Sequence, residues 1–188
     1  MSGEWDFVGL LGLKLDGLTV VLTYENGNLV KAVTRGNGQV GEVITANAKT
    51  FKNIPLSIGY KGNLTLRGEA IIKYSDFEKI NNKIEDVDSK YKNPRNLCSG
   101  SVRQLNSKIT AERNVNFVAF ALISAENVDF ENSIEKQFQW LEEQGFEVVE
   151  RKTVTENNME ETVEYFQEKI KEYDYPSDGL VLMYDDIE

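Results

Sequence analysis

Leu11-Gly12-Leu13-Lys14-Leu15-Asp16-Gly17 is an apolar run that carries one lysine and ends in an Asp-Gly turn. Residues 18–24 follow at once with a period of two, which is typical of a strand. The pattern predicts that Lys14 lies at a strand edge and faces a pocket. In apolar surroundings a lysine loses part of its preference for the charged form, and a neutral amine is a nucleophile. An exposed strand lysine is the alternative interpretation of this stretch alone.

Composition limits the chemistry that the chain can perform. Its 188 residues are 40% hydrophobic, which suits one core, and we expect a single domain over residues 1–188. No apolar run has the length of a signal peptide or membrane span, so a cytoplasmic protein with no membrane partner is expected. Cys98 is the only cysteine and histidine is absent. The usual zinc ligands and His-based acid–base schemes are therefore excluded, no metal site is predicted, and chemistry must use lysine, arginine and carboxylates.

The net charge of −10 argues against nonspecific coating of nucleic acid. The charge is nevertheless divided by region. Residues 90–113 carry six cations against one acid, Glu112, and the surplus acid lies mostly beyond residue 125. A basic face on an acidic body is therefore possible.

Strands and helices follow one another without a regular β-α-β alternation, which indicates an α+β fold. Asn26-Gly27 predicts a hairpin between strands at residues 18–24 and 28–34. Further strands are expected at residues 63–73, 114–123, 145–149 and 178–184, with 114–123 buried on both faces. Helices are expected after a capping box at residues 75–78, from residue 132 to Gly145, and over residues 159–173. A short helix near residues 44–47 and a helical or irregular segment at residues 97–106 complete the pattern.

Two glycine-containing motifs allow more than one interpretation. Gly36-Asn37-Gly38 predicts either an ordinary turn or a phosphate cradle. In Arg67-Gly68-Glu69, a glycine inside a strand marks the close approach of a ligand or another backbone. Glu69 would be costly to bury without a partner.

The order and spacing of several motifs carry a resemblance to a known family. They are Lys14-Leu15-Asp16-Gly17, Thr34-Arg35-Gly36-Asn37-Gly38, Gly41-Glu42, Ile44-Thr45-Ala46-Asn47, Arg67-Gly68-Glu69, Asn93-Pro94-Arg95-Asn96, Ser99-Gly100-Ser101-Val102-Arg103-Gln104-Leu105 and Asp178-Gly179-Leu180-Val181-Leu182. Together they resemble the adenylation domain of bacterial NAD-dependent DNA ligases. The similarity runs from about residue 10 to residue 184.

The resemblance implies a nucleotidyltransferase fold like that of DNA ligases and mRNA capping enzymes, with antiparallel sheets flanked by helices around an adenylate pocket. It implies that Lys14 attacks the α-phosphate of NAD, expels nicotinamide mononucleotide and holds AMP. The adenylate then passes to the 5′-phosphate of a nick in double-stranded DNA, which the 3′-hydroxyl seals. NAD is the implied AMP donor, Mg²⁺ is expected, and the oligomeric state stays open, a monomer included.

Individual roles carry over by resemblance. Lys14, Asp16 and Asp178 are the expected catalytic residues. Asp16 and Gly17 shape the turn behind the nucleophile, Glu69 accepts from the ribose hydroxyls, and Phe120 replaces the tyrosine that the family stacks on adenine. Arg35, Arg95 and Arg103 are expected to contact phosphates of the nucleotide or the nick. These roles suit phosphoryl transfer, which needs cations around one nucleophile, and the planar fork of arginine binds two phosphate oxygens at once.

The chain departs from the family pattern at two positions. Gly12 stands where the family carries a glutamate that contacts the adenylate, and Met183 stands where it carries a lysine. A lysine there is expected to add charge beside the nucleophile and the phosphate. Loss of one such group typically costs about 10²–10³ in rate, so adenylation is expected to be slow or undetectable.

The chain also lacks the family's nicotinamide-mononucleotide-binding segment, further catalytic lysine, oligonucleotide-binding fold, zinc module and helix-hairpin-helix module. Free-standing nick sealing is therefore not expected. Two alternatives to a partial enzyme follow. The first is a degenerate module that binds adenine nucleotide or nicked DNA without catalysis. The second is a scaffold that binds nucleic acid or a protein partner through residues 90–113.

Overall fold

The computed structural model describes residues 7–35 and 41–187. The strands are β1 (Gly9–Leu15), β2 (Leu18–Glu25), β3 (Asn28–Thr34), β4 (Leu64–Ile71), β5 (Asn116–Ala125), β6 (Arg151–Val154) and β7 (Ser177–Tyr184). The helices are α1 (Thr45–Ala48), α2 (Tyr74–Asn82), α3 (Pro94–Val102), α4 (Ser107–Ala111), α5 (Ile134–Glu143) and α6 (Met159–Glu172), with a 3₁₀ turn η1 (Val87–Ser89). Gly36-Asn37-Gly38, which predicted a turn or a phosphate cradle, lies outside the described residues.

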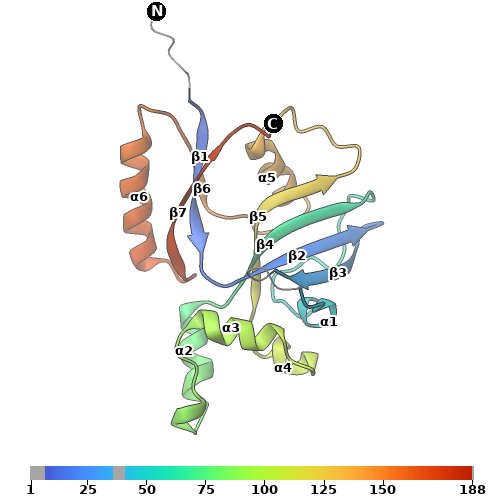
Figure 1. Ribbon diagram of the computed structural model, residues 1–188, viewed down its shortest axis with the longest axis vertical. Coiled ribbons are helices and arrows are strands. Elements are labelled where there is room, and N and C mark those ends of the chain that lie inside the picture. Colours follow the sequence, from blue (N-terminus) through green and yellow to red (C-terminus); the bar gives the residue numbers. More distant parts are fainter. Residues whose placement is uncertain (1–6, 36–40, 188) are drawn as a thin grey trace, which may run out of the picture.

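Two antiparallel sheets make the framework. One has the strand order β6-β1-β7 and the other β3-β2-β4-β5. Figure 1 shows the chain passing directly from β1 in the first sheet to β2 in the second, with α6 along the outside of the first sheet. The predicted α+β fold, with antiparallel sheets flanked by helices, is confirmed. Within the described residues, no helix is long and apolar enough to cross a membrane.

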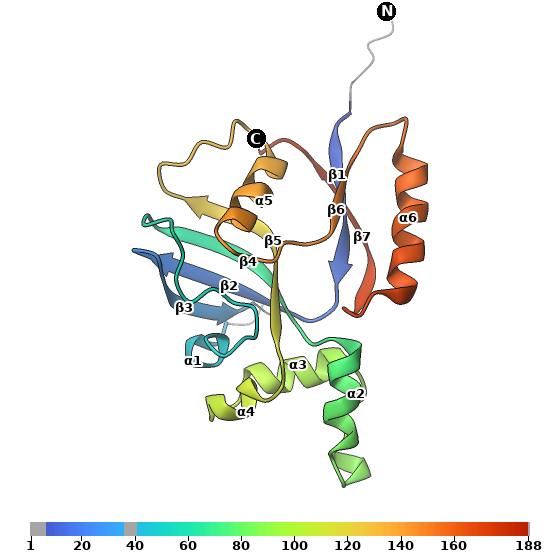
Figure 2. The ribbon, with the colours of Figure 1, turned by 180° about the vertical axis from the view of Figure 1, so that it is seen from behind.

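Each sheet packs its outer face on helices. Leu11 and Leu13 of β1 lie in one apolar cluster with Phe166 of α6. The four-stranded sheet packs on the other cluster, in which Leu22 is joined by Phe138 of α5. Figure 2 shows α5 on the side of this sheet away from the viewer of Figure 1. Because side chains alternate along a strand, residues between the buried ones face the space between the sheets.

The Asn26-Gly27 hairpin is confirmed. Both residues have positive φ, 49° and 81°, as a type I′ turn requires. β2 and β3 pair on either side of it. This turn could be predicted because its signal is local and needs no information about distant contacts.

Two strand predictions need correction. The strand at 114–123 is β5 (Asn116–Ala125), but only its first four residues are buried, so it is not covered on both faces along its length. Residues 145–149 do not form a strand. They make one isolated parallel bridge, between Val148 and Ala119, and the strand β6 begins later, at Arg151.

The predicted capping box at residues 75–78 is also wrong. The N-cap of α2 is Lys73, and no side chain caps this end. The Ser75 hydroxyl and main-chain N–H both bond to the Asp174 carboxylate instead. A carboxylate from outside the helix thus supplies the acceptor that the local motif predicted.

Candidate active site

The end of β1 is fixed by a bulge opposite the Asp-Gly turn. Lys14 pairs with Gly179, and Leu15 pairs with Ser177, so Asp178 is the extra residue on β7. The Ser177 hydroxyl donates to the main-chain carbonyl of Lys14 at 3.0 Å. Lys14 therefore lies on a stretch of strand that is held firmly up to the turn.

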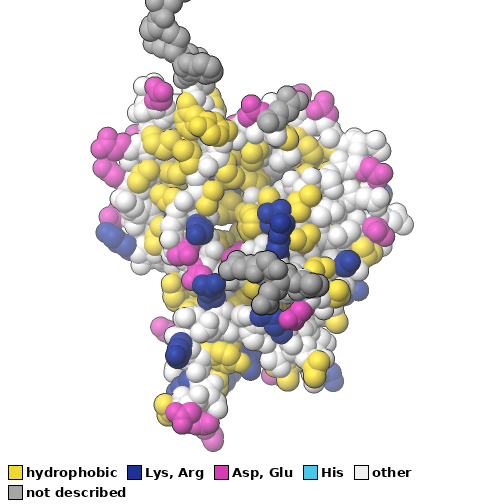
Figure 3. All heavy atoms as spheres, in the orientation of Figure 1, with side chains coloured by type: hydrophobic (Ala, Val, Ile, Leu, Met, Phe, Trp, Pro, Cys, Tyr) yellow, Lys and Arg dark blue, Asp and Glu magenta, His cyan; other side chains and the backbone are white. Residues whose placement is uncertain are grey.

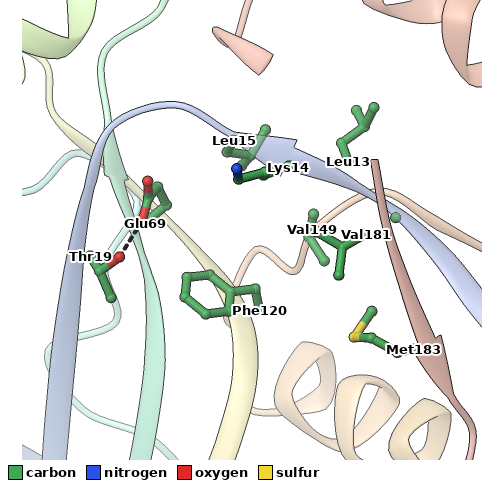
Figure 4. Close-up of a pocket in the computed structure, with 10 residues that line it drawn as sticks. Leu13, Lys14, Leu15, Thr19, Glu69, Phe120, Val149, Val181 and Met183 are labelled. Carbon is green, nitrogen blue, oxygen red and sulfur yellow. Dashed lines mark hydrogen bonds between the residues drawn. The ribbon is translucent and has the colours of Figure 1, made fainter. Parts of the chain in front are cut away.

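A cavity of about 300 Å³ opens between the two sheets beside this turn. Its lining comes from β1, β2, β4, β5, β7 and the segment before β6: Gly12, Leu13, Lys14, Leu15, Thr19, Glu69, Phe120, Val149, Val181 and Met183. Figure 4 shows Lys14 and Glu69 toward one end of the cavity and Met183 toward the other, with Phe120 between. Figure 3 shows hydrophobic side chains gathered in the hollow, with Lys and Arg side chains below it. Three predicted site residues from three different strands, Lys14, Glu69 and Phe120, thus lie around one pocket.

Glu69 is the most constrained polar group in this pocket. Its carboxylate accepts from the main-chain N–H of Gly17 at 3.0 Å and from the Thr19 hydroxyl at 2.9 Å. Burial raises the pKa of the Glu69 carboxyl, the two hydrogen bonds oppose this shift, and the charges of Asp16 and Asp178 add to it. Three predicted site carboxylates therefore lie close enough to influence one another.

Lys14 lines the pocket, as predicted, and most of the other lining side chains are apolar. The Lys14 side chain is nevertheless exposed, as the alternative interpretation of this stretch expected. The neighbouring β1 residues Leu11 and Leu13 are buried on the side of the strand that packs on α6. Lys14 points to the other side, toward the open space between the sheets. The amine is therefore accessible to a ligand that enters from solvent.

Phe120 reaches the pocket because β5 is irregular at this point. Ala119 pairs with Gly68 and Ala121 pairs with Arg67, so Phe120 is the bulged residue between them. A bulge re-aims a side chain, and here it presents the ring to the cavity. Gly68 pairs with Ala119 beside the bulge, and a Cβ at Gly68 would lie 2.4 Å from the ring of Phe117, so this close approach requires a glycine.

The three predicted phosphate ligands are not part of the lining. Arg95 pairs with Asp16 at 3.7 Å, and Arg103 pairs with Glu42 at 3.4 Å. Arg35 is exposed just after β3, where its main-chain N–H donates to the carbonyl of Thr19 at 2.9 Å. The structure therefore holds the three arginines beside different residues and does not bring them together.

Met183 lies away from Lys14, which corrects the expected effect of this position. Met183 pairs with Leu10, four residues before Lys14 on β1. Four residues of strand span roughly 13 Å, so the main chain of a lysine at position 183 would lie far from Lys14. Met183 instead neighbours Gly12: a Cβ built on Gly12 would lie 3.9 Å from the Met183 methyl carbon. The two departures from the family pattern therefore share one end of the pocket.

Two lining residues, Thr19 and Val149, lie outside the motifs that the sequence singled out. Thr19 sits on a predicted strand, but its register opposite Glu69 depends on pairing between distant segments. The described residues contain no group of three or more His, Cys, Asp or Glu side chains that could hold a metal ion. In this part of the chain there is thus no such group of side chains to coordinate the Mg²⁺ that the resemblance implies.

Comparison with known proteins decides the family. A sequence profile described as the NAD-dependent DNA ligase adenylation domain matches residues 5–188. The chain belongs to this family. In this adenylation domain, Lys14 and the turn that follows it border a pocket between two sheets.

Full-length relatives of this adenylation domain are much longer. It is 65% identical over 179 residues to a DNA ligase of Lachnoclostridium phytofermentans and 63% identical over 179 residues to one of Ruminiclostridium cellulolyticum. Each alignment covers 95% of this chain and 27% of the relative. A solved structure from a study of DNA binding by Lig E DNA ligases aligns with 95% of this chain and 56% of its own, with a TM-score of 0.50 and 20% identity. That likeness supports the shared fold.

Proposed function

We propose that this adenylation domain takes AMP from NAD onto Lys14, as the first step of sealing a DNA nick. The Lys14 amine attacks the α-phosphorus of NAD, a P–N bond forms, and the bond between phosphorus and the nicotinamide mononucleotide oxygen breaks. The amine proton leaves to solvent, and nicotinamide mononucleotide departs. In the next step a DNA 5′-phosphate displaces the lysine and takes the AMP.

One observation carries this proposal: Lys14, Glu69 and Phe120 come from three strands and line a single cavity. Phe120 offers a flat face on which a base can stack, and Glu69 offers carboxylate oxygens near ribose hydroxyls. The accessible Lys14 then stands at the phosphate end. Phosphoryl transfer needs this kind of positioning more than it needs an acid–base pair.

Family membership supports the choice of donor and partner. The family is NAD-dependent, so NAD is the proposed donor, and nicked double-stranded DNA is the proposed acceptor. Arg95 beside Asp16 of the turn and Arg35 beside the lining residue Thr19 support a role on phosphates of the nick, and Arg103 is proposed for the same role by the family pattern alone. Such a substrate would place the protein in the bacterial cytoplasm, in replication or repair of DNA.

Intact-mass measurement tests the proposal. The purified chain is incubated with NAD, and separately with ATP, and a gain of one AMP is expected with NAD. Lys14→Arg keeps the positive charge but should abolish the gain, and Lys108→Arg on the distant helix α4 is the matched control that should retain it. No gain with either donor would overturn self-adenylation.

A second candidate is a module that binds the nucleotide without transferring it. Gly12 and Met183, at one end of the pocket, favour it because both replace charged groups of the family pattern. Calorimetry with AMP, NAD and ATP distinguishes the candidates: binding without a mass gain supports the module, and no binding excludes it.

A further inference from the structure

The pocket is chemically divided along its length. The polar side chains of its lining are Lys14, Thr19 and Glu69, and all three lie around the Asp-Gly turn. The rest of the lining is apolar. Figure 4 shows Val149 and Val181 between Lys14 and Met183, with Met183 toward the opposite end, and Gly12 neighbours Met183. A bound nucleotide whose phosphate reaches Lys14 must therefore place its base among apolar side chains.

Main-chain hydrogen-bonding groups of β1 near this apolar end already have partners. From Gly9 to Gly12, β1 is paired on both sides, with β6 and with β7. The Leu13 N–H donates to the Glu150 carbonyl at 3.1 Å, and the Val149 N–H donates to the Ala119 carbonyl at 2.9 Å. β1 therefore offers few main-chain donors or acceptors to the edge of a base.

We infer that this pocket selects purine nucleotides by ring shape and stacking, and that it does not read the substituent at purine position 6. The inference rests on the proposed function, and it narrows that function to a substrate class. Met183 and Gly12 determine this specificity, because they line the apolar end of the pocket and offer no polar side-chain group to a base.

The physical consequence is weak discrimination between purine nucleotides that differ at position 6. A site that hydrogen-bonds a polar substituent rejects an analogue without it by about 10⁴–10⁵, whereas an apolar pocket discriminates by only about 10–200-fold. Moreover, an exocyclic amine buried without a partner loses its hydration, which disfavours binding. Purine riboside 5′-monophosphate, in which hydrogen replaces the 6-amine of AMP, should therefore bind at least as tightly as AMP.

Calorimetry on the purified chain with AMP, purine riboside 5′-monophosphate and IMP tests this inference. The expected result is that the first analogue binds no more weakly than AMP and that IMP binds within tenfold of AMP. AMP binding more than tenfold tighter than both analogues would overturn the inference and leave the proposed function intact. Absence of binding by all three would overturn both.

Substitution at Met183 links the selectivity to this end of the pocket. Met183→Gln has a similar size and adds an amide that can accept from the 6-amine and donate to the ring nitrogen, so it should shift the preference at least tenfold toward AMP. Met183→Leu is the matched apolar control and should leave the ratio of the three dissociation constants unchanged. An unchanged ratio in a folded Met183→Gln variant that still binds nucleotide would contradict the assignment.

Discussion

Glu69 accepts a hydrogen bond from the main-chain N–H of Gly17, 52 residues earlier in the chain, at 3.0 Å. Gly17 belongs to the turn that follows Lys14, and Glu69 lies on β4 of the other sheet. The same carboxylate also accepts from Thr19 on β2. The buried Glu69 side chain thus links the turn after Lys14 to the four-stranded sheet on the opposite side of the pocket.

Removal of this carboxylate should destabilise the fold. Glu69→Ala leaves the Gly17 N–H and the Thr19 hydroxyl without their acceptor, and an unsatisfied buried group costs about 1–3 kcal/mol. We expect urea unfolding to show a loss of about 2 kcal/mol. Glu78→Ala, on the exposed face of α2, is the control, with an expected change within about 0.5 kcal/mol. Equal stability of the two variants would contradict the role of Glu69.

The raised pKa of Glu69 predicts a pH dependence. Burial raises this pKa from 4.5, so above pH 4.5 the folded state binds more protons at this site than the unfolded state. The contribution of Glu69 to stability therefore falls as pH rises from 4.5 through the folded pKa. Relative to Glu69→Gln, the wild-type protein should lose stability over this interval and show a constant difference above it. A difference that grows more favourable to wild type with rising pH would refute this sign.

Gly17 should not tolerate a side chain. A Cβ at this position would lie 2.1 Å from the carbonyl oxygen of Ala70, so Gly17→Ala must push the turn away from β4. We expect a loss of about 1–3 kcal/mol in chemical denaturation. Gly59→Ala is the matched control, because its nearest neighbour would be the Gln144 side-chain oxygen at 3.9 Å. A Gly17→Ala variant as stable as Gly59→Ala would show that this close approach is not required.

Two arginines that form ion pairs should differ in their importance for stability. Arg151 has a side chain only 12% exposed, and it bonds to Glu135 at 2.8 Å and Glu142 at 2.6 Å. Arg151→Met leaves these carboxylates without their cation and should cost about 1–3 kcal/mol. Arg95, 62% exposed and 3.7 Å from Asp16, should cost less than about 1 kcal/mol when changed to Met. Thermal unfolding of both variants checks the order, and the reverse order would contradict it.

Local signals in the sequence predicted much of the fold. Strand alternation at residues 18–24 and the Asn26-Gly27 turn are properties of neighbouring residues, and both agree with β2 and its hairpin. The α2 capping box failed because Asp174, about 100 residues away in the chain, competes for Ser75. Strand β6 was misplaced because its pairing with β1 depends on that distant strand rather than on its own four residues.

The candidate site, too, could be predicted only in part. The motifs pointed to Lys14, Glu69 and Phe120, and these residues do share a pocket. Sequence could not decide how exposed Lys14 is, since exposure depends on which elements stand opposite. It also could not give the register of β1 with β7, which places Met183 opposite Leu10 rather than beside Lys14.

The strand that carries Val181 and Met183 has a single neighbour, β1, in the described part of the chain. By contrast, Glu69 belongs to β4, which is flanked by β2 and β5. One wall of the cavity therefore includes an edge strand, whereas the other includes a strand that is paired on both sides. Because β7 has one neighbour and β4 has two, we expect β7 to fray more readily, so that a ligand would enter and leave the pocket past β7.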